Sequence, residues 1–349
     1  MDTPQTGHRS NWVGLVVIFV ILLVLVGVLF PAVQAAIEAS RKASCQCHLH
    51  MIGLGLQNYA STFRHFPGTG RVVESGGEKH VQGWSFLVQI LPYLEYGTLY
   101  STINADGDPD TPEAKPDQEA GRLAVSKTVI REFVCPSAPS EFLGPAGTPP
   151  GGARTTYKGM AATHIESLNQ CLGLGKPLYG EPKMHPDGMM FPGPGLTSEE
   201  IVDGTAHTIM CAETIDDTAS LWTRGKDAVL VGLPSYVVQG AVNTGAYSYF
   251  HPKWPGWTPR FDGVLAAAQN PPARTYLAYD FRPGGADEGT YPAFDGSQPA
   301  WGPSSGHVGI VNHGFCDGSV QALSTRIDPA AYMFMITKNG GDPYHPDPP

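Results

Sequence analysis

A chain of 349 residues is long enough to bury a hydrophobic core without disulfide bonds, as one large domain or two smaller ones. Its 42 glycines and 32 prolines follow no three-residue period, which excludes a collagen-like rod and predicts a loop-rich head. The formal net charge of -10, with no run of lysines and arginines, argues against a nucleic-acid partner, because phosphate binding requires a basic surface.

The N-terminal region is predicted to be a membrane anchor. Residues 12–30 contain no charged side chain, and a helix of that length spans roughly 28 Å, close to the hydrocarbon thickness of a bilayer. Residues 31–36, PAVQAA, loosely resemble the cleavage site of a signal peptide. Because the helical pattern continues past them, we favour a retained anchor that contacts the lipid bilayer through residues 12–30, after a short leader or cytoplasmic tail over residues 1–11.

Residues 31–66 are predicted to continue this helix onto the head. Pro31 is tolerated in membrane helices, so the two halves are expected to form one bent rod of roughly 80 Å. Gly53 and Gly55 permit close approach to a packed element. The apolar residues recur at helical spacing and predict one face that lies on a sheet: Leu49, Ile52, Leu56, Tyr59 and Phe63. The sequence Phe66-Pro67-Gly68 is expected to end the helix.

The remaining residues, 67–349, are predicted to form a head of short antiparallel strands joined by turns rich in Gly, Pro and Asp. Apolar runs lie at residues 208–212, 228–231 and 235–238. Residues 308–316 and 319–324 are expected to pair as a hairpin with a two-residue type I′ turn at Asp317-Gly318. That register sets Phe315 opposite Val320, with both facing the core.

Two histidines and an aspartate near the end of the chain, His307, His313 and Asp317, raise the question of a metal site. In an extended strand, the ten steps from His307 to Asp317 span roughly 33 Å, so the two cannot hold one ion. We therefore interpret His307 as the residue that leads into the strand, with a hydrogen bond to a loop. Asp317 is interpreted as the first turn residue, where a left-handed backbone favours Asp.

No catalytic motif is recognisable in the sequence. It contains no G-x-S-x-G, no H-E-x-x-H and no phosphate-binding glycine loop. His48 and His50 are two apart on the predicted helix and point away from each other, as do Cys45 and Cys47, which excludes a shared metal ion. The six cysteines show no zinc spacing. We therefore expect a protein that is not an enzyme, with no catalytic residue, no metal and no cofactor.

The Pro- and Gly-rich residues 251–306 carry several aromatic side chains. Aromatic residues on loops commonly cover the rim of a core, and they also form surfaces that bind sugars or protein partners. The competing hypothesis for function is accordingly a tethered extracytoplasmic protein that binds carbohydrate or peptide through these loops.

Five blocks in order along the chain resemble the DUF1559 family, pilin-like proteins of planctomycete type labelled by a C-terminal H-X9-DG motif. The blocks are residues 31–59, 83–100, 133–139 (FVCPSAP), 201–213 (IVDGTAHTIMCAE) and 307–320. His307, nine further residues and then Asp317-Gly318 match the naming motif. Asp203, Gly204 and Glu213 fall in the fourth block. The resemblance implies a structural role for these motif residues.

The resemblance implies an α+β, pilin-like fold: a long N-terminal transmembrane α-helix packed on an antiparallel β-sheet head. It places the anchor in the inner (cytoplasmic) membrane and the head on the periplasmic side. It also implies a non-enzymatic structural or secretion-associated role, with other pilin-like subunits or envelope components as partners. Cys45 and Cys135 lie in family blocks, so a disulfide between them and two free buried thiols are the alternatives. Because other pseudopilins carry calcium in the head, a structural calcium at an acidic loop such as Asp216-Asp217 stays an alternative to the absence of a cofactor.

One departure from the pilin pattern concerns assembly. Typical precursors carry a glutamate at the fifth mature position, where it pairs with the N-terminal amine of a neighbouring subunit. If Gly14 marks the cleavage point, the fifth residue after it is Phe19, and no glutamate lies within residues 12–30. A tethered head is therefore favoured over a processed, methylated filament subunit.

Overall fold

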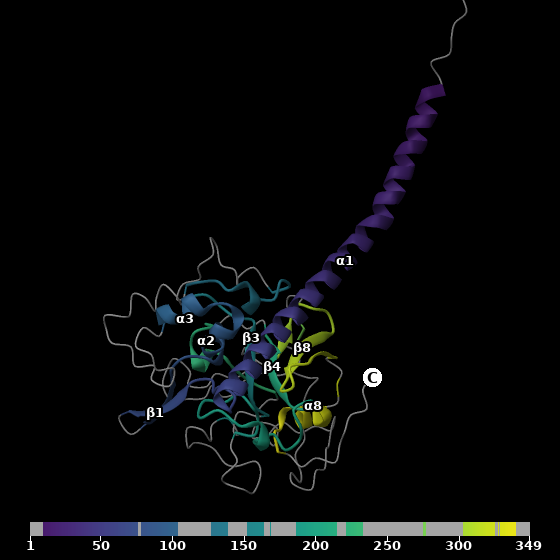
Figure 1. The fold of residues 1–349 in the computed structure, drawn as a ribbon. Helices are drawn as coiled ribbons and strands as arrows, with labels where there is room; N and C mark the ends of the chain where they lie inside the picture. The colour runs from purple at the N-terminus through teal and green to yellow at the C-terminus, as the bar shows by residue number, and fades with distance from the viewer. Residues whose placement is uncertain are drawn as a thin grey trace, which may run out of the picture.

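The computed structural model of the chain describes residues 10–75, 78–103, 127–138, 152–163, 168, 186–214, 221–232, 275–276, 303–324, 327 and 329–339. Its main elements are a 54-residue helix, α1 (Ser10–Phe63), and a five-stranded sheet. Figure 1 shows α1 in purple, with its N-terminal half projecting from the head and its C-terminal half lying against it. The expectation of an α+β fold with a long N-terminal helix is confirmed.

Helix α1 runs without interruption through Pro31. Among the described residues it is the one helix long and apolar enough to cross a membrane, and all large apolar side chains of residues 12–30 are exposed. Arg64 adopts a left-handed backbone with φ 68°, a conformation that commonly ends helices. The helix therefore ends at Phe63, three residues before the boundary expected at residue 66.

The apolar face predicted for the second half of α1 packs on the head, apart from its last residue. Leu49, Ile52 and Leu56 are fully buried, and Tyr59 is 3% exposed. Phe63 is 44% exposed and stacks on Tyr59 with ring centroids 4.5 Å apart. The prediction that Phe63 lies on the sheet is wrong, because the helix extends past the packed surface in its last turn.

The central sheet has the strand order β5-β3-β4-β8-β9. The strands are β3 (Tyr157–Ala162), β4 (Ile209–Glu213), β5 (Val229–Val231), β8 (Ile310–Phe315) and β9 (Val320–Ser324). All neighbours pair antiparallel except β3 and β5, which are parallel. This pairing corrects the expected antiparallel sheet. No hairpin joins β3 to β5, because β4 lies between them in the chain, so nothing forces an antiparallel register.

Two apolar clusters cover the two faces of the sheet. One contains the buried residues of α1, and the other contains Tyr332, Phe334 and Ile336 of the C-terminal helix α8 (Pro329–Ile336). The side chains of β5 alternate between the clusters, with Val229 and Val231 in the first and Leu230 in the second. The sheet is therefore a middle layer between α1 and α8.

Shorter elements surround this core. A peripheral antiparallel hairpin joins β1 (Arg71–Ser75) to β2 (Glu78–Gln82), and β6 (Thr275–Tyr276) pairs with β7 (Ser304–Ser305). The short helices are α2 (Phe86–Gln89), η1 (Leu91–Leu94), α3 (Gly97–Ile103), η3 (Arg131–Phe133), η7 (Ser198–Glu200) and η8 (Gly225–Asp227). A Cβ added at Gly55 would lie 3.2 Å from Leu94 Cδ2, so this glycine allows η1 to approach α1.

The C-terminal hairpin forms, but with a different register from the predicted one. Gly314 pairs with Val320, and the Phe315 amide donates to the Ser319 carbonyl at 2.9 Å. The loop thus has three residues, 316–318, and Gly318 supplies the left-handed position with φ 86°. The shift by one residue puts Phe315 and Val320 on opposite faces: Phe315 lies in the α8 cluster, and Val320 packs on the α1 cluster.

Candidate functional site

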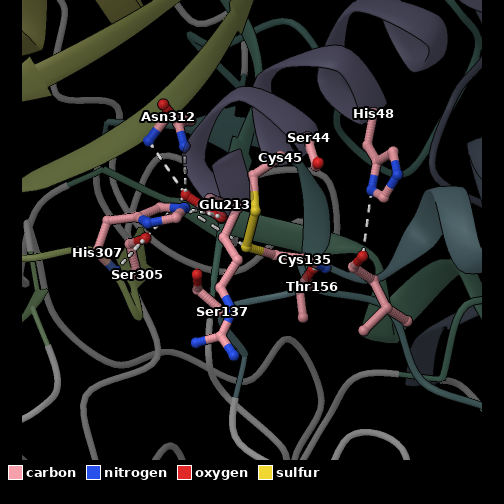
Figure 2. The surroundings of a disulfide bond; sticks show 12 residues. Ser44, Cys45, His48, Cys135, Ser137, Thr156, Glu213, Ser305, His307 and Asn312 are labelled. Atoms are coloured by element: carbon pink, nitrogen blue, oxygen red, sulfur yellow. Dashed lines mark hydrogen bonds and ion pairs between the residues drawn. A yellow bond between two sulfur atoms is a disulfide. The ribbon is translucent and has the colours of Figure 1, made fainter. Parts of the chain in front are cut away.

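A disulfide joins the anchor helix to the head. Cys45 of α1 bonds to Cys135, in the loop after η3, with their Cα atoms 5.0 Å apart and a sequence separation of 90 (Figure 2). The Cys135 amide donates to Thr156 Oγ1 at 2.7 Å, which fixes this loop on the start of β3. Of the two alternatives left open by the sequence, the structure forms the disulfide.

His307 lies beside this disulfide, in the bend that precedes β8. Its Nδ1 is 2.6 Å from Glu38 Oε1 on α1, and its Nε2 is 3.6 Å from Cys135 Sγ. The imidazole is 3% exposed. Ser137 Oγ also donates to Glu38 Oε1 at 3.2 Å, so the carboxylate accepts from two segments of the head. The sequence suggested that His307 hydrogen-bonds a loop. In the structure His307 also contacts the anchor helix, through Glu38.

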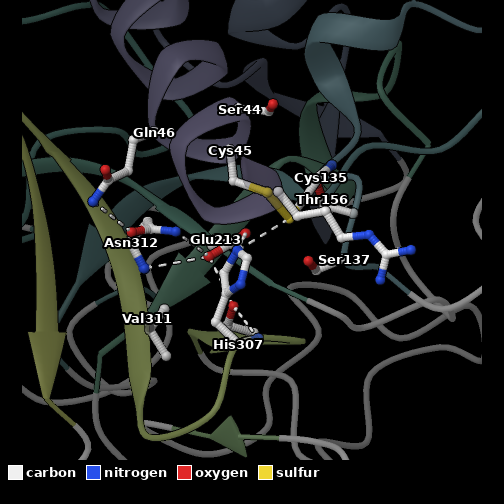
Figure 3. A network of polar contacts seen from close by, with 12 residues as sticks. Ser44, Cys45, Gln46, Cys135, Ser137, Thr156, Glu213, His307, Val311 and Asn312 are labelled. Carbon is white, nitrogen blue, oxygen red and sulfur yellow. Dashed lines mark hydrogen bonds and ion pairs between the residues drawn. A yellow bond between two sulfur atoms is a disulfide. The ribbon is translucent and has the colours of Figure 1, made fainter. Parts of the chain in front are cut away.

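Glu213, the last residue of β4, is the second buried ionisable group at this junction. Its Oε2 accepts from Ser305 Oγ at 2.9 Å and from Asn312 Nδ2 at 3.0 Å. Its Oε1 is buried without a hydrogen bond, 3.8 Å from His307 Nε2. Asn312 Oδ1 accepts in turn from Gln46 of α1, so the network in Figure 3 links β4, β8 and the helix.

Burial controls the electrostatics of this network. It raises the pKa of the Glu213 carboxyl above its usual value, and the nearby His307 and the hydrogen bonds from Ser305 and Asn312 partly offset that rise. Burial also raises the pKa of the Cys211 thiol to about 12. The Cys211 thiol therefore stays protonated at neutral pH, which makes it a poor nucleophile.

Asp317 and Gly318 lie at the opposite end of β8 from His307 and are not brought to the same site. Asp317 Oδ1 accepts from the Ser319 amide at 2.8 Å and from Ser319 Oγ at 2.6 Å, which closes the turn. The turn packs directly on α1: the Gly318 carbonyl lies 3.0 Å from His50 Nδ1, and a Cβ at Gly53 would lie 3.3 Å from Gly318 Cα. The motif aspartate and glycine thus serve the hairpin and its contact with the helix.

Asp203 and Gly204 form a turn that leads into β4. Gly204 has φ 98°, and the Asp203 amide donates to the Lys338 carbonyl at 3.1 Å, after α8. Lys338 is itself buried, where its ammonium donates to the Gly188 carbonyl at 3.3 Å and lies 4.8 Å from the Phe191 ring centroid. These contacts join the segment after α8 to the turn before β4, and they indicate a structural role for Asp203 and Gly204.

Three sequence-based hypotheses lie outside the described residues. They are the calcium site at Asp216-Asp217, the strand at residues 235–238, and most of the aromatic segment 251–306. His48 and His50 are described, and they bind different groups: His48 Nδ1 lies 3.2 Å from the Val134 carbonyl, whereas His50 contacts Gly318.

The side chains that contact His307 and Glu213 at this junction, which are Glu38, Ser305 and Asn312, are not predicted by the sequence. Glu38 has no sequence signal of its own, because it is a single charge that follows the anchor, and it meets His307 across 269 residues of sequence. Asn312 and Ser305 carried no signal, because single polar residues in an apolar strand or before it occur in many sequences. The family blocks did contain Cys45, Cys135, Glu213 and His307, and the structure brings the ligand atoms of these four residues within 4.8 Å of one another.

Comparison with known proteins gives one match. No curated protein and no solved structure matches the chain. A family model described as a protein of unknown function (DUF1559) matches residues 34–330, a range that runs from the second half of α1 past the end of β9. The chain therefore belongs to the DUF1559 family.

Proposed function

We propose that this chain is a membrane-anchored, pilin- or pseudopilin-like envelope protein with a non-enzymatic, structural or secretion-associated role. The observation that carries the proposal is that α1 is both the apolar helix and the core helix of the head. Residues 12–30 are exposed, whereas Leu49, Ile52 and Leu56 of the same helix are fully buried. A head built around its own anchor moves with the anchor as one unit.

The first head contact lies close to the end of the apolar segment. Glu38 follows Phe30 by eight residues, which is about 12 Å along a helix. Because Glu38 hydrogen-bonds His307 and Ser137, the head begins within about 12 Å of the bilayer surface. A disulfide at this junction is typical of oxidising compartments, which favours a periplasmic head on an inner (cytoplasmic) membrane anchor.

The proposed partners are other pilin-like subunits or envelope components in contact with the exposed faces of α1. Without a glutamate in residues 12–30, the helix lacks the group that pairs with a neighbouring N-terminus, so we propose a tethered head rather than a filament subunit. The alternative of carbohydrate or peptide binding gains no support from the described residues, since the aromatic segment lies mostly outside them.

The native cysteine Cys47 provides a test of orientation. It is an exposed thiol on α1, two residues from the disulfide, whereas Cys211 and Cys316 are buried thiols. The full-length chain, produced in a bacterial host with a periplasm, is treated with a membrane-impermeant maleimide before lysis. We expect Cys47 to be labelled in intact cells and the protein to resist carbonate extraction from membranes.

The test is made in a Cys171→Ser chain, because Cys171 lies outside the described residues. In that chain, Cys47→Ser is the matched control and should abolish labelling, because Cys211 and Cys316 are buried and react only after denaturation. Labelling that requires lysis would place the head in the cytoplasm and overturn the proposal. N-terminal sequencing of the extracted protein separates the two pilin models. An intact Met1 or Asp2 supports a permanent anchor, whereas a start at Leu15 indicates processing and a filament-type subunit.

A further inference from the structure

Four buried ligand atoms meet where α1 joins the head. They are Cys45 Sγ, Cys135 Sγ, Glu213 Oε1 and His307 Nε2, and all lie within 4.8 Å of one another. The residues come from α1, the loop after η3, the end of β4 and the bend before β8 (Figures 2 and 3). Two sulfurs, one imidazole nitrogen and one carboxylate oxygen make up a donor set that zinc accepts in proteins.

The two ligands other than sulfur are already oriented by their neighbours. His307 Nδ1 is engaged by Glu38 Oε1 at 2.6 Å, so a proton on Nδ1 leaves the Nε2 lone pair free toward the cluster. Glu213 is fixed through Oε2 by Ser305 and Asn312, while its Oε1 accepts no hydrogen bond. A buried carboxylate oxygen without a donor is rare in folded proteins and indicates that this atom has another partner.

The spacing of these atoms can be compared with a tetrahedral zinc site. With bonds of about 2.3 Å to sulfur and 2.0–2.1 Å to nitrogen or oxygen, the S···N edge is about 3.6 Å and the N···O edge about 3.4 Å. Here Cys135 Sγ lies 3.6 Å from His307 Nε2, and His307 Nε2 lies 3.8 Å from Glu213 Oε1. The edge that must change most is the one between the sulfurs, which the disulfide holds too short for both to bind one ion.

We propose that reduction of the Cys45–Cys135 disulfide converts this cluster into a zinc site, with Cys45, Cys135, His307 and Glu213 as the ligands. A dithiol reductant gives two electrons and two protons: the S–S bond breaks, two thiols form, and the reductant becomes a disulfide. Zinc then displaces the two thiol protons to solvent and forms two Zn–S bonds and one bond each to His307 Nε2 and Glu213 Oε1.

The donor set also selects the ion. Calcium and magnesium take oxygen ligands, whereas thiolate and imidazole favour zinc. The junction between anchor and head would then be closed by a disulfide under oxidising conditions and by zinc under reducing ones. This inference does not depend on the pilin-like role, because it concerns only the side chains at the junction.

Zinc binding by the full-length chain in detergent micelles tests the proposal. The protein is reduced anaerobically with a phosphine, incubated with zinc, separated from free ion by gel filtration, and assayed for bound metal beside the oxidised protein. We expect one zinc ion per reduced chain and none per oxidised chain. Cobalt(II) in place of zinc should give the absorption of a thiolate-bound metal. His307→Ala and Glu213→Gln should each weaken zinc binding by at least about tenfold.

Cys47→Ser is the matched control, since it removes an exposed thiol from the same helix and should leave zinc binding intact. Absence of stoichiometric zinc in the reduced chain, unchanged zinc binding in His307→Ala, or loss of zinc binding in Cys47→Ser would each overturn the proposal. Near-ultraviolet circular dichroism monitors the fold. If reduction alone unfolds the head, zinc must restore the signal in the wild-type chain and not in His307→Ala, and failure to restore it also rejects the site.

Discussion

His313 in β8 is a buried histidine held in its neutral form. Its Nδ1 lies 3.0 Å from the Val311 carbonyl, and its Nε2 lies 2.9 Å from the Tyr332 hydroxyl. Nδ1–H therefore donates to the carbonyl, while Nε2 accepts from the hydroxyl. Burial lowers the pKa of His313 to about 4, against 6.5 for an ordinary histidine.

This shift predicts a loss of stability in mild acid. Between pH 6.5 and 4 the unfolded chain binds a proton at His313 and the folded chain does not. The contribution of the neutral His313 to the free energy of unfolding is therefore complete above pH 6.5, and it declines as the pH falls to about 4. The full loss is about 3 kcal/mol of the free energy of unfolding. Denaturant titrations of the detergent-solubilised chain across this range measure it.

The variant His313→Gln should flatten this pH dependence, because it lacks the titrating ring while all other groups are retained. His50→Gln, which changes an exposed histidine on α1, is the control for the replacement of a histidine by glutamine, and the slope of His313→Gln should be smaller than the slope of this control. An unchanged slope in His313→Gln would contradict the assignment.

At the level of single residues, the sequence identified the members of the junction only in part. Cys45, Cys135, Glu213 and His307 stood out because they fall in family blocks. Glu38 could not be paired with His307 from sequence, since an ion pair across 269 residues depends on the fold and not on local spacing. The spacing along an extended strand predicts that His307 and Asp317 are far apart, but it does not predict which groups each side chain contacts.

Among the secondary-structure elements, α1 shows most clearly what periodicity can predict. Its length and the burial of Leu49, Ile52 and Leu56 follow from apolar spacing along one helix. The exposure of Phe63 does not, because the same spacing continues after the sheet ends. The parallel pairing of β3 with β5 was also beyond prediction, since strand neighbours distant in sequence are chosen by the packing of the whole sheet.

The register of the hairpin was mispredicted for a different reason. An Asp-Gly pair fits a two-residue turn, and it equally fits the last two positions of a three-residue loop. The chain adopts the longer loop, in which Gly318 has φ 86° and faces α1 across Gly53. Contact with the helix favours this form, because Gly53 and Gly318 together let the turn approach the helix backbone.

Because Gly318 has a positive φ, we expect a substitution at this position to lower the stability of the head through the backbone conformation. A Cβ added there meets only Gln57 Cγ at 3.9 Å, so the cost of Gly318→Ala is conformational, about 1–2 kcal/mol for a left-handed residue with a side chain. Gly318→Asn should cost less, because Asn tolerates this conformation. The midpoints of urea unfolding compare the two variants, and equal losses would show that the turn does not require positive φ.

For the whole molecule, the main feature is that one helix serves two environments. The large apolar side chains of residues 12–30 contact nothing in the described head, whereas those of the second half build its core. An exposed apolar surface of that extent is unfavourable in water and requires a cover such as lipid. The first half of α1 thus requires contact with an apolar environment such as lipid, whereas the second half requires contact with the core of the head.

This division predicts that charges in the middle of residues 12–30 will release the chain from membranes without disturbing the packing of the head. Each lysine at the centre of a spanning helix costs about 2.5–3.5 kcal/mol of insertion free energy, so Ile21→Lys with Val24→Lys costs about 5–7 kcal/mol. Each apolar residue at the centre contributes only about 0.3–0.6 kcal/mol of favourable insertion free energy. The two lysines therefore offset most of the insertion free energy that the apolar residues supply together. We expect this variant to lose carbonate-resistant membrane association.

Val13→Lys with Phe30→Lys is the matched control, because lysines near the ends of a spanning helix extend their ammonium groups to the interface. The control should remain in the membrane, and equal release of both variants would show that residues 12–30 do not span the bilayer.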